Sequence, residues 1–255
     1  MKIKDEEKHW DTIAPDYDSE VFDVFRSDRN KILQRYFRKL GDKTKTAIDF
    51  GCGIGKAFAY LAPRFKNVLA VDISQECIDV ARRNDYDNIT YKQVDLTQPR
   101  LGLPKADFAL CCNVAILPEP DKNSRIIKNI SKSLRAGGVG LFVVPALESA
   151  LYSTLMMMAW FRREGVAAED IPDNELDNLD ATKRELVQGL IHIQGVPTKH
   201  YLRPELDVVF RDAGLTINKV EKLEYDWRTE FDKPPAWLRE PLPWDWMIEC
   251  RKGLS

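Results

Sequence analysis

Residues 47–56, Ala-Ile-Asp-Phe-Gly-Cys-Gly-Ile-Gly-Lys, combine a short apolar run with three closely spaced glycines. The apolar run predicts a buried central strand, because such runs fill both faces of a parallel sheet. Gly51, Gly53 and Gly55 remove the side chains where the chain must turn from that strand into a helix, so a ligand can lie directly against the backbone. The segment therefore predicts a ligand-binding loop at the end of a central strand.

The spacing of these glycines separates two kinds of ligand. A dinucleotide-binding loop has glycines at relative positions one, three and six, where a pyrophosphate meets the helix N-terminus. Here the glycines stand at positions one, three and five, and Lys56 occupies the sixth. Asp49, two residues before the first glycine, would repel a phosphate and attract a cation. The loop favours a cationic ligand.

The pattern D-x-G-x-G-x-G, formed by Asp49, Gly51, Gly53 and Gly55, resembles the first motif of the class I S-adenosylmethionine-dependent methyltransferases. The resemblance implies S-adenosylmethionine as cofactor and S-adenosylhomocysteine as product. In that family the loop, which here includes Cys52, packs under the adenosine and methionine portions, and the acid lies near the ligand's ammonium group. The family fold is a Rossmann-like, doubly wound α/β sheet of seven mostly parallel strands with an antiparallel last strand.

Alternating strand and helix signals independently predict a parallel sheet with helices on both faces. The core pattern covers residues 40–145, and an L-x-x-G-G string ending at Gly138 also resembles the family. We expect strands at 47–50, 67–71, 89–94, 107–112, 139–144, 216–227 and 244–251. We expect helices at 29–40, 56–65, 75–84, 124–134, 148–163, 182–191 and 204–213.

Asp72 ends the second predicted strand about twenty residues beyond the loop. A carboxylate at this position can accept both ribose hydroxyls, which fits a dinucleotide as well as S-adenosylmethionine. Ile73 follows where an apolar side chain could flank the adenine. In the resembling family an acid placed like Asp95 bonds the adenine amino group, and the amide of the next residue, Leu96, meets the ring. A helix or turn cap is the alternative for this acid.

Asn113 and Val114 follow the fourth predicted strand. Open parallel sheets bind ligands beyond the carboxyl ends of their strands, so these two residues should face the sulfonium and the incoming acceptor. The string Asn-Val-Ala-Ile differs from the Asn/Asp-Pro-Pro-Tyr/Phe string associated with methylation of nucleic-acid amino groups. Its absence argues against a nucleic-acid substrate.

The segment from Trp10 to Asp18 resembles the W/F-D-x-x-A-x-x-Y-D pattern of many small-molecule methyltransferases. In those proteins the tyrosine, here Tyr17, closes over the ligand. The alternative is that Trp10 and Tyr17 staple a helix to the core, and we assign Trp10 that structural role.

About fifty residues separate the fifth predicted strand from Arg203, which is too long for a plain connection. In the resembling family such insertions build a lid over the acceptor pocket, and an ordinary helical pair on the sheet edge is the alternative. The expected organisation is an N-terminal helical cap (1–40), a cofactor-binding core (41–145), a helical lid (146–202) and the C-terminal part of the core (203–255).

A general base is needed only if the acceptor arrives protonated, because the sulfonium donor is already activated. The candidates are His200 and His192, whose ordinary pKa suits proton transfer near neutrality. Glu148 and Tyr152, which come shortly after the fifth predicted strand, are the next candidates for this base. A lid histidine that serves only as a structural hydrogen-bonding group is the alternative.

The composition argues against several classes of binding partner. With 38 Lys and Arg against 40 Asp and Glu, the chain lacks the basic excess that attracts nucleic acid or an anionic membrane. The five cysteines form no C-x-x-C pair, so we expect no disulfide framework and no metal site. The N-terminus lacks an apolar segment of signal-peptide length, and the apolar window 151–161 is too short to span a bilayer, which predicts a cytoplasmic protein.

The favoured interpretation is an enzyme that methylates a small molecule on nitrogen or oxygen. Two alternatives stay open. One is a dinucleotide-dependent reductase, and the other is a non-catalytic protein of the same fold that acts through a partner. Nothing in the sequence fixes the oligomeric state.

Overall fold

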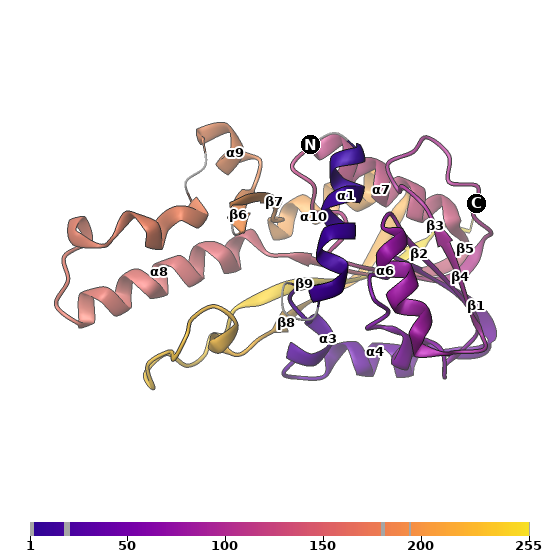
Figure 1. Ribbon diagram of the computed structural model, residues 1–255, viewed down its shortest axis with the longest axis horizontal. Helices are drawn as coiled ribbons and strands as arrows, with labels where there is room; N and C mark the ends of the chain where they lie inside the picture. The colour runs from indigo at the N-terminus through magenta and orange to yellow at the C-terminus, as the bar shows by residue number, and fades with distance from the viewer. Residues whose placement is uncertain (1–2, 18–20, 180–181, 194, 255) are drawn as a thin grey trace.

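A seven-stranded sheet in the order β3-β2-β1-β4-β5-β9-β8 forms the centre of the protein (Figure 1). The computed structural model describes residues 3–17, 21–179, 182–193 and 195–254. The strands are β1 (Asp42–Phe50), β2 (Phe65–Asp72), β3 (Ile89–Gln93), β4 (Ala106–Cys112), β5 (Leu134–Pro145), β8 (Leu215–Glu224) and β9 (Trp244–Lys252). Strands β1 to β5 pair in parallel, whereas β9 runs antiparallel to both of its neighbours. The expected Rossmann-like sheet with an antiparallel last strand is confirmed.

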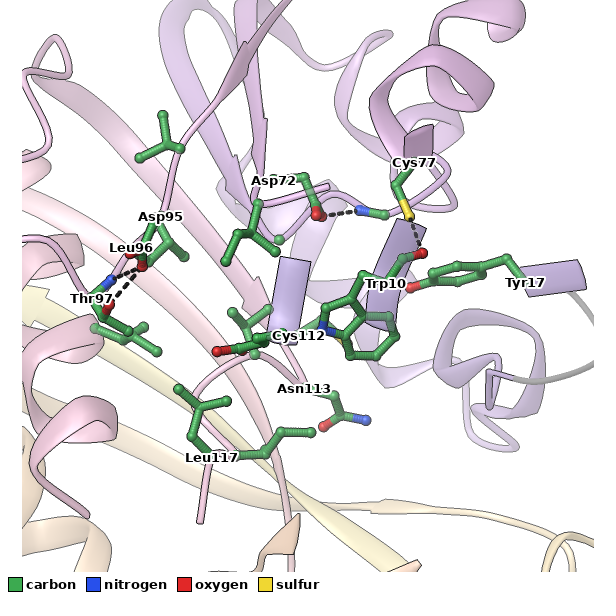
Figure 2. Close-up of a pocket in the computed structure, with 18 residues that line it drawn as sticks. Trp10, Tyr17, Asp72, Cys77, Asp95, Leu96, Thr97, Cys112, Asn113 and Leu117 are labelled. Carbon is green, nitrogen blue, oxygen red and sulfur yellow. Dashed lines mark hydrogen bonds between the residues drawn. The ribbon is translucent and has the colours of Figure 1, made fainter. Parts of the chain in front are cut away.

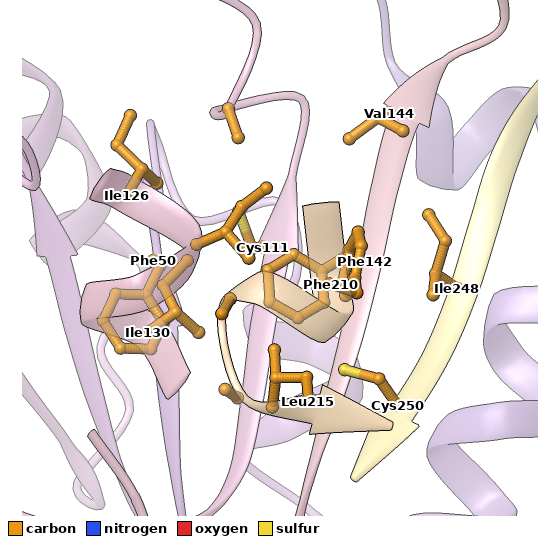
Figure 3. Packing of buried hydrophobic residues seen from close by; sticks show 14 of the residues in the cluster. Phe50, Cys111, Ile126, Ile130, Phe142, Val144, Phe210, Leu215, Ile248 and Cys250 are labelled. Atoms are coloured by element: carbon orange, nitrogen blue, oxygen red, sulfur yellow. The ribbon is translucent and has the colours of Figure 1, made fainter. Parts of the chain in front are cut away.

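Alternating apolar residues along the strands give the sheet two hydrophobic faces. On one face, Phe142 of β5 packs edge-on against Phe210 of α10 (Arg203–Asp212), with ring centroids 4.9 Å apart, and α7 (Pro120–Ser133) lies beside it (Figure 3). On the other face, Phe108 of β4 meets Phe37 of α4 (Ile32–Leu40). This second layer also holds α5 (Phe58–Leu61) and α6 (Gln75–Ala81). Both faces are therefore covered, as a parallel sheet requires.

The inserted segment contains more than the expected helices. After α8 (Leu147–Arg163) come two 3₁₀ turns, η3 (Ala168–Asp170) and η4 (Asp173–Leu179), and the short α9 (Lys183–Val187). The helix expected at 182–191 is present but shorter than predicted, because Gly189, with φ +74°, ends the helical segment and β6 (Leu190–Ile193) begins. A side chain at Gly189 would place its Cβ 2.4 Å from the carbonyl oxygen of His200. Strand β6 then pairs antiparallel with β7 (Val196–Lys199).

The helix expected at 56–65 is also shorter than predicted, since only the four residues of α5 are helical and turns flank them. The glycine loop occupies the residues before α5, and Gly55, with φ +89°, cannot continue a right-handed helix. Near the N-terminus the structure has α1 (Ile3–Ile13), the turn η1 (Ala14–Asp16) and α3 (Val24–Ser27).

Two segments project from the same end of the sheet, α8 and the connection between β8 and β9, which includes η5 (Trp227–Thr229) (Figure 1). Aromatic side chains join them. The ring centroids of Tyr152 and Trp227 lie 5.6 Å apart, those of Trp160 and Phe231 lie 6.0 Å apart, and the Arg163 guanidinium covers the Trp237 ring. The projection thus has a small hydrophobic core of its own.

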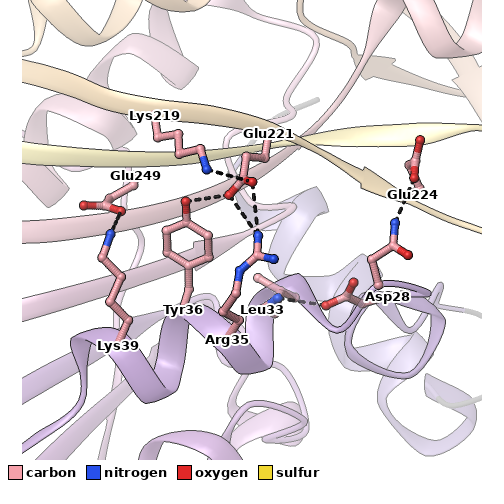
Figure 4. A network of polar contacts seen from close by, with 10 residues as sticks. Asp28, Leu33, Arg35, Tyr36, Lys39, Lys219, Glu221, Glu224 and Glu249 are labelled. Atoms are coloured by element: carbon pink, nitrogen blue, oxygen red, sulfur yellow. Dashed lines mark hydrogen bonds and ion pairs between the residues drawn. The ribbon is translucent and has the colours of Figure 1, made fainter.

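Helix α4 is tied to the antiparallel edge of the sheet by a polar network (Figure 4). Glu221 of β8 accepts a hydrogen bond of 2.5 Å from the Tyr36 hydroxyl and forms ion pairs with Arg35 and Lys219. Lys39 forms a 2.8 Å ion pair with Glu249 of β9. The Tyr36 bond has a buried donor, because Tyr36 is 3% exposed, whereas Arg35 and Lys39 are exposed cations.

Burial decides which member of this network matters most for stability. We expect Tyr36→Phe to lower the free energy of unfolding by about 1–3 kcal/mol, because it leaves a partly buried carboxylate without its hydroxyl donor. Arg35→Gln removes a mostly exposed ion pair and should cost less than about 1 kcal/mol. Urea unfolding curves measure both, and a larger loss for Arg35→Gln would contradict the assignment.

Candidate functional site

A cavity lies beyond the carboxyl ends of β1, β2, β3 and β4, beneath helix α1 (Figure 2). The volume of the cavity is about 720 Å³ when the open space at its mouth is included. Of the eleven positions predicted to contact a cofactor, nine line this cavity: Tyr17, Gly51, Gly53, Asp72, Ile73, Asp95, Leu96, Asn113 and Val114. The other two, Asp49 and Cys52, are buried residues outside the lining.

The glycine loop is shaped by backbone conformation and by close packing. Gly51 and Gly53 have φ values of +70° and +49°, which side chains rarely allow. A Cβ at Gly51 would lie 2.2 Å from the Val114 side chain, and one at Gly53 would lie 2.5 Å from the Tyr17 hydroxyl. Any larger residue at either position would therefore push into the cavity or its wall.

Asp72 joins the glycine loop to the end of β2. Its Oδ2 accepts from the backbone N–H of Gly53 at 2.8 Å, and its Oδ1 accepts from the N–H of Ser74 at 3.0 Å. Burial raises the pKa of this carboxyl, and the backbone hydrogen bonds oppose that rise. Each oxygen keeps a further lone pair, so the carboxylate can accept two more donors from a ligand in the cavity.

Asp49 lies buried beneath the loop, 2% exposed. Its Oδ2 has no hydrogen-bond partner among the residues that the structure describes. Burial, and then the nearby charge of Asp72, raise the pKa of Asp49 to about 7. An unpaired buried carboxylate is costly, and a cationic group in the cavity would relieve that cost.

Asp95 already has local partners. Its Oδ1 accepts from the N–H and hydroxyl of Thr97 at 2.7 and 2.6 Å, and its Oδ2 accepts from Gln98 at 2.8 Å. This is the turn cap that the sequence left as an alternative. The residue also lines the cavity, and Oδ2 keeps one lone pair that a ligand donor can use.

Helix α1 forms the roof of the cavity and is held by hydrogen bonds to the sheet. The Ser74 hydroxyl donates to Asp11 at 2.6 Å, and the Gln93 amide donates to Glu7 at 2.9 Å. Trp10 lines the cavity, so its role is wider than the structural one predicted. Burial raises the pKa of the Tyr17 hydroxyl. Asp18, the last residue of the N-terminal motif, lies outside the described residues.

Sequence reasoning missed half of the lining. The missed residues come from the roof and from loops that turn back over the strand ends. The N–H of Leu117, for example, donates to the Asn123 side chain, which in turn donates to the Leu117 carbonyl. No spacing signal could have identified such a contact. The missed residues are Glu6, Trp10, Cys77, Val94, Thr97, Cys112, Ile116, Leu117 and Ile126.

None of the four predicted catalytic side chains lines the cavity in the described structure. His200 is buried, its Nδ1 lies 2.9 Å from the Thr198 carbonyl oxygen, and burial lowers its pKa to about 4. His192 lies on β6 opposite Pro197 of β7, and its Nε2 has no hydrogen-bond partner among the described residues. Glu148 accepts from the backbone N–H of Arg203 at 2.8 Å, and the Tyr152 hydroxyl donates to the Pro241 carbonyl at 3.3 Å. Their catalytic roles stay predictions.

Within the described part of the chain, no group of three or more His, Cys, Asp or Glu side chains is placed to hold a metal ion. No described helix combines the length and the apolar character that a membrane crossing requires.

Comparison with known proteins gives one family match and one curated relative. Residues 47–138 match the methyltransferase domain family. The curated relative is chondramide synthase cmdD of Chondromyces crocatus, 26% identical over 236 residues. The match covers 80% of this chain but only 6% of that protein.

Solved structures share the fold at low sequence identity. An S-adenosylmethionine-dependent methyltransferase from Methanosarcina mazei has a TM-score of 0.63 at 17% identity, covering 86% of this chain and 98% of its own. DhpI in complex with S-adenosylhomocysteine (SAH) has a TM-score of 0.64 at 17% identity, with 99% and 98% covered. The N-methyltransferase NodS from Bradyrhizobium japonicum WM9 has a TM-score of 0.56 at 14% identity, with 96% and 97% covered.

The unpaired carboxylate of Asp49 predicts an unusual effect on stability. A carboxyl whose pKa is raised on folding binds its proton more tightly in the native state, so the free energy of unfolding falls as pH rises from about 4 to about 7. We expect Asp49→Asn to stabilise the unliganded protein by about 1–3 kcal/mol at pH 8, with a gain that shrinks toward pH 4. Urea unfolding at pH 4.5 and pH 8 measures this.

The matched control for this experiment is Asp79→Asn. Asp79 is a half-exposed acid on α6 that pairs with Arg82. Its substitution should change stability little at either pH, because exposed ion pairs contribute little. An equal effect of Asp49→Asn at both pH values would contradict the raised pKa.

Proposed function

We propose that this chain, a class I S-adenosylmethionine-dependent methyltransferase by its domain and fold, transfers the methyl group of S-adenosylmethionine to nitrogen or oxygen of a small-molecule acceptor. The observation that carries the proposal is the buried, unpaired oxygen of Asp49 below a glycine loop that Asp72 holds open. The residues present fit the cofactor, because a buried carboxylate oxygen without a partner lies in the strand that leads into the loop, where the ammonium group of an amino-acid tail would satisfy it.

The charge of the cavity supports the same cofactor. Its lining includes the carboxylates of Glu6, Asp72 and Asp95 and, among the described residues, no Lys, Arg or His. A pyrophosphate would be repelled there, whereas a sulfonium or ammonium would be attracted. The dinucleotide-dependent reductase considered from the sequence is therefore disfavoured.

Each part of the cofactor has a place in the proposed site. Asp49 would bind the ammonium group, and Asp72 would accept the ribose hydroxyls. The turn after β3 would hold the adenine, with Asp95 near its amino group and Ile73 and Leu96 beside the ring. Asn113 and Val114 would lie near the sulfonium, and the loop with Gly51, Cys52 and Gly53 would pass beneath the ligand.

The bound cofactor supplies an activated methyl group for in-line displacement. The chain then has to align the acceptor and exclude water, and such positioning can account for about 7–11 kcal/mol of barrier lowering. Trp10 and Tyr17 in the roof suit the exclusion of water. None of the four predicted bases lines the cavity, so the described side chains there that could accept a proton from the acceptor are the carboxylates of Glu6, Asp72 and Asp95.

The charge of the chain and the covered cavity support a small-molecule acceptor. The near-balanced charge of the chain offers no general attraction to polynucleotides, and α1 covers part of the cavity. The N-methyltransferase NodS shares the fold, which agrees with a nitrogen acceptor without establishing one here. Because the chain spans about 6% of chondramide synthase cmdD, the activity of that whole protein is not carried over. A cytoplasmic location stays a prediction.

Titration with SAH tests the cofactor site. We expect saturable binding in calorimetry, weakened about 10- to 100-fold by Asp49→Asn, because a charge-assisted hydrogen bond is worth about 1.5–3 kcal/mol. Asp72→Ala should also weaken binding at least tenfold. Asp79→Asn, which changes an acid outside the cavity, should leave the affinity unchanged.

Two results would contradict the proposal. One is the absence of SAH binding by the folded wild-type protein. The other is tighter binding of a nicotinamide dinucleotide than of SAH. Because Asp49→Asn is expected to stabilise the fold while weakening the ligand, a loss of affinity in this variant cannot be ascribed to unfolding.

A further inference from the structure

We infer that Glu6, on the roof helix α1, determines which base the cavity accepts. Its carboxylate accepts one N–H of the 6-amino group of adenine, while Asp95 accepts the other N–H from the opposite wall. The inference rests on the proposed function, since it deepens the same cofactor site. The two carboxylates together select a 6-aminopurine over a 6-oxopurine.

Three acids at neighbouring strand ends set the direction in which the cofactor would lie. Asp49 and Asp72 stand at the ends of β1 and β2, and Asp95 follows the end of β3 (Figure 2). These strands are adjacent in the order β3-β2-β1. Neighbouring strands are about 4.8 Å apart, so the row of acids extends over about 10 Å. A cofactor with its ammonium group at Asp49 and its ribose at Asp72 would place its base at Asp95.

One face of helix α1 anchors the helix over two of these strand ends. Glu7 accepts a hydrogen bond from the side-chain amide of Gln93, the last residue of β3, at 2.9 Å. Asp11 accepts from the hydroxyl of Ser74, which follows β2, at 2.6 Å. Glu7 and Asp11 are four residues apart and therefore share a helix face. The first turn of α1 thus lies over the end of β3.

A second face of the same helix is directed at the ligand. Glu6 and Trp10 are also four residues apart, and both line the cavity. Because Glu7 is held at the end of β3, its neighbour Glu6 lies close to the turn that carries Asp95. Burial raises the pKa of the Glu6 carboxyl, Lys122 opposes the rise, and the charge of Asp95 adds to it. The two acids therefore lie within electrostatic reach of each other.

The hydrogen bonds of Asp95 leave room for one more donor. Its Oδ1 accepts from the N–H and the hydroxyl of Thr97, and its Oδ2 accepts from the Gln98 amide. One lone pair of Oδ2 remains, whereas an adenine amino group has two N–H donors. Glu6 supplies the second acceptor, because its carboxylate forms no hydrogen bond or ion pair with any residue that the structure describes.

A 6-oxopurine would not satisfy this pair of acids. It presents an oxygen in place of the amino group, so acceptors would face an acceptor and both carboxylates would lose a donor. A site built to bond an N–H group rejects an analogue that lacks it, because its buried polar groups are left unpaired. The arrangement thus selects the base by the hydrogen bonds that the wrong base cannot make.

Three ligands test the inference by calorimetric titration of the full chain. They are SAH, its 6-deamino analogue with hydrogen in place of the amino group, and S-inosylhomocysteine with an oxo group there. We expect Glu6→Ala to raise the Kd of SAH about 3- to 10-fold, because it removes a hydrogen bond to a charged group. The Kd of the 6-deamino analogue should stay within about twofold, because that ligand has no amino group for Glu6 to bind.

Glu6→Gln tests the selection of the base. Its side-chain amide can turn an N–H toward an oxo group, so the preference for SAH over S-inosylhomocysteine should narrow about tenfold. The matched control is Glu7→Gln, which changes the adjacent acid and keeps an oxygen that can accept from Gln93. This control should keep the wild-type ratio of the two Kd values, since any loosening of the roof acts on both ligands alike.

Failure of the inference can be told from failure of the proposed function. If the folded wild-type protein binds none of the three ligands, the cofactor assignment itself is wrong. If it binds SAH, but Glu6→Ala changes the Kd of SAH and of the 6-deamino analogue by the same factor, Glu6 has only a structural role and the inference is overturned. An unchanged preference for SAH in Glu6→Gln would overturn it as well.

Discussion

The hydrogen bonds that join Asp72 to the backbone of Gly53 and Ser74 are the interaction on which the site depends. They fix the end of β2 against the loop that leaves β1, and they hold that loop in a conformation with positive φ values. Because the loop has no side chains at Gly51 and Gly53, a ligand can contact its backbone. Val114 and Tyr17 occupy the space that a Cβ at these two positions would take. The Asp72 carboxylate thus fixes the loop at the base of the cavity, and each of its oxygens keeps a lone pair for a ligand donor.

The same region concentrates negative charge that the fold does not neutralise. Asp49 is buried beside Asp72 with an unpaired oxygen. Asp245 is buried at the start of β9, opposite Pro145 of β5, and burial raises its pKa to about 6. Such groups lower the stability of the unliganded protein. That cost is typical of a binding site, where polar groups are arranged for a ligand and remain incompletely satisfied without it.

Much of the cofactor half of the site could be predicted from sequence, because its signals are local. The glycine spacing, Asp49 and the acid that ends β2 each follow a strand, and strand ends meet at one edge of a parallel sheet. The roof was predicted less well. Trp10 was assigned to packing, and the loop that carries Leu117 has no pattern that would place it in the cavity.

Contacts made by the last two strands of the sheet could not be predicted, because they form only by tertiary pairing. The Tyr225 hydroxyl donates to Asp245 at 2.8 Å, and no spacing rule relates these two residues. The predicted bases failed to reach the cavity for a related reason. The inserted segment was read as helical, but Gly189 ends the helix and a hairpin follows, so that His192 lies on β6 and His200 places its Nδ1 against the Thr198 carbonyl.

The position of β9 determines the order in which parts of the sheet can form during synthesis. This strand is the last along the described chain, yet it lies between β5 and β8 in the sheet (Figure 1). Strands β1 to β5, which carry the glycine loop and Asp72, pair with one another without it. The buried Asp245 reaches this sheet only when β9 inserts between β5 and β8. We therefore expect a chain emerging from the ribosome to assemble the glycine loop and Asp72 before the sheet is complete.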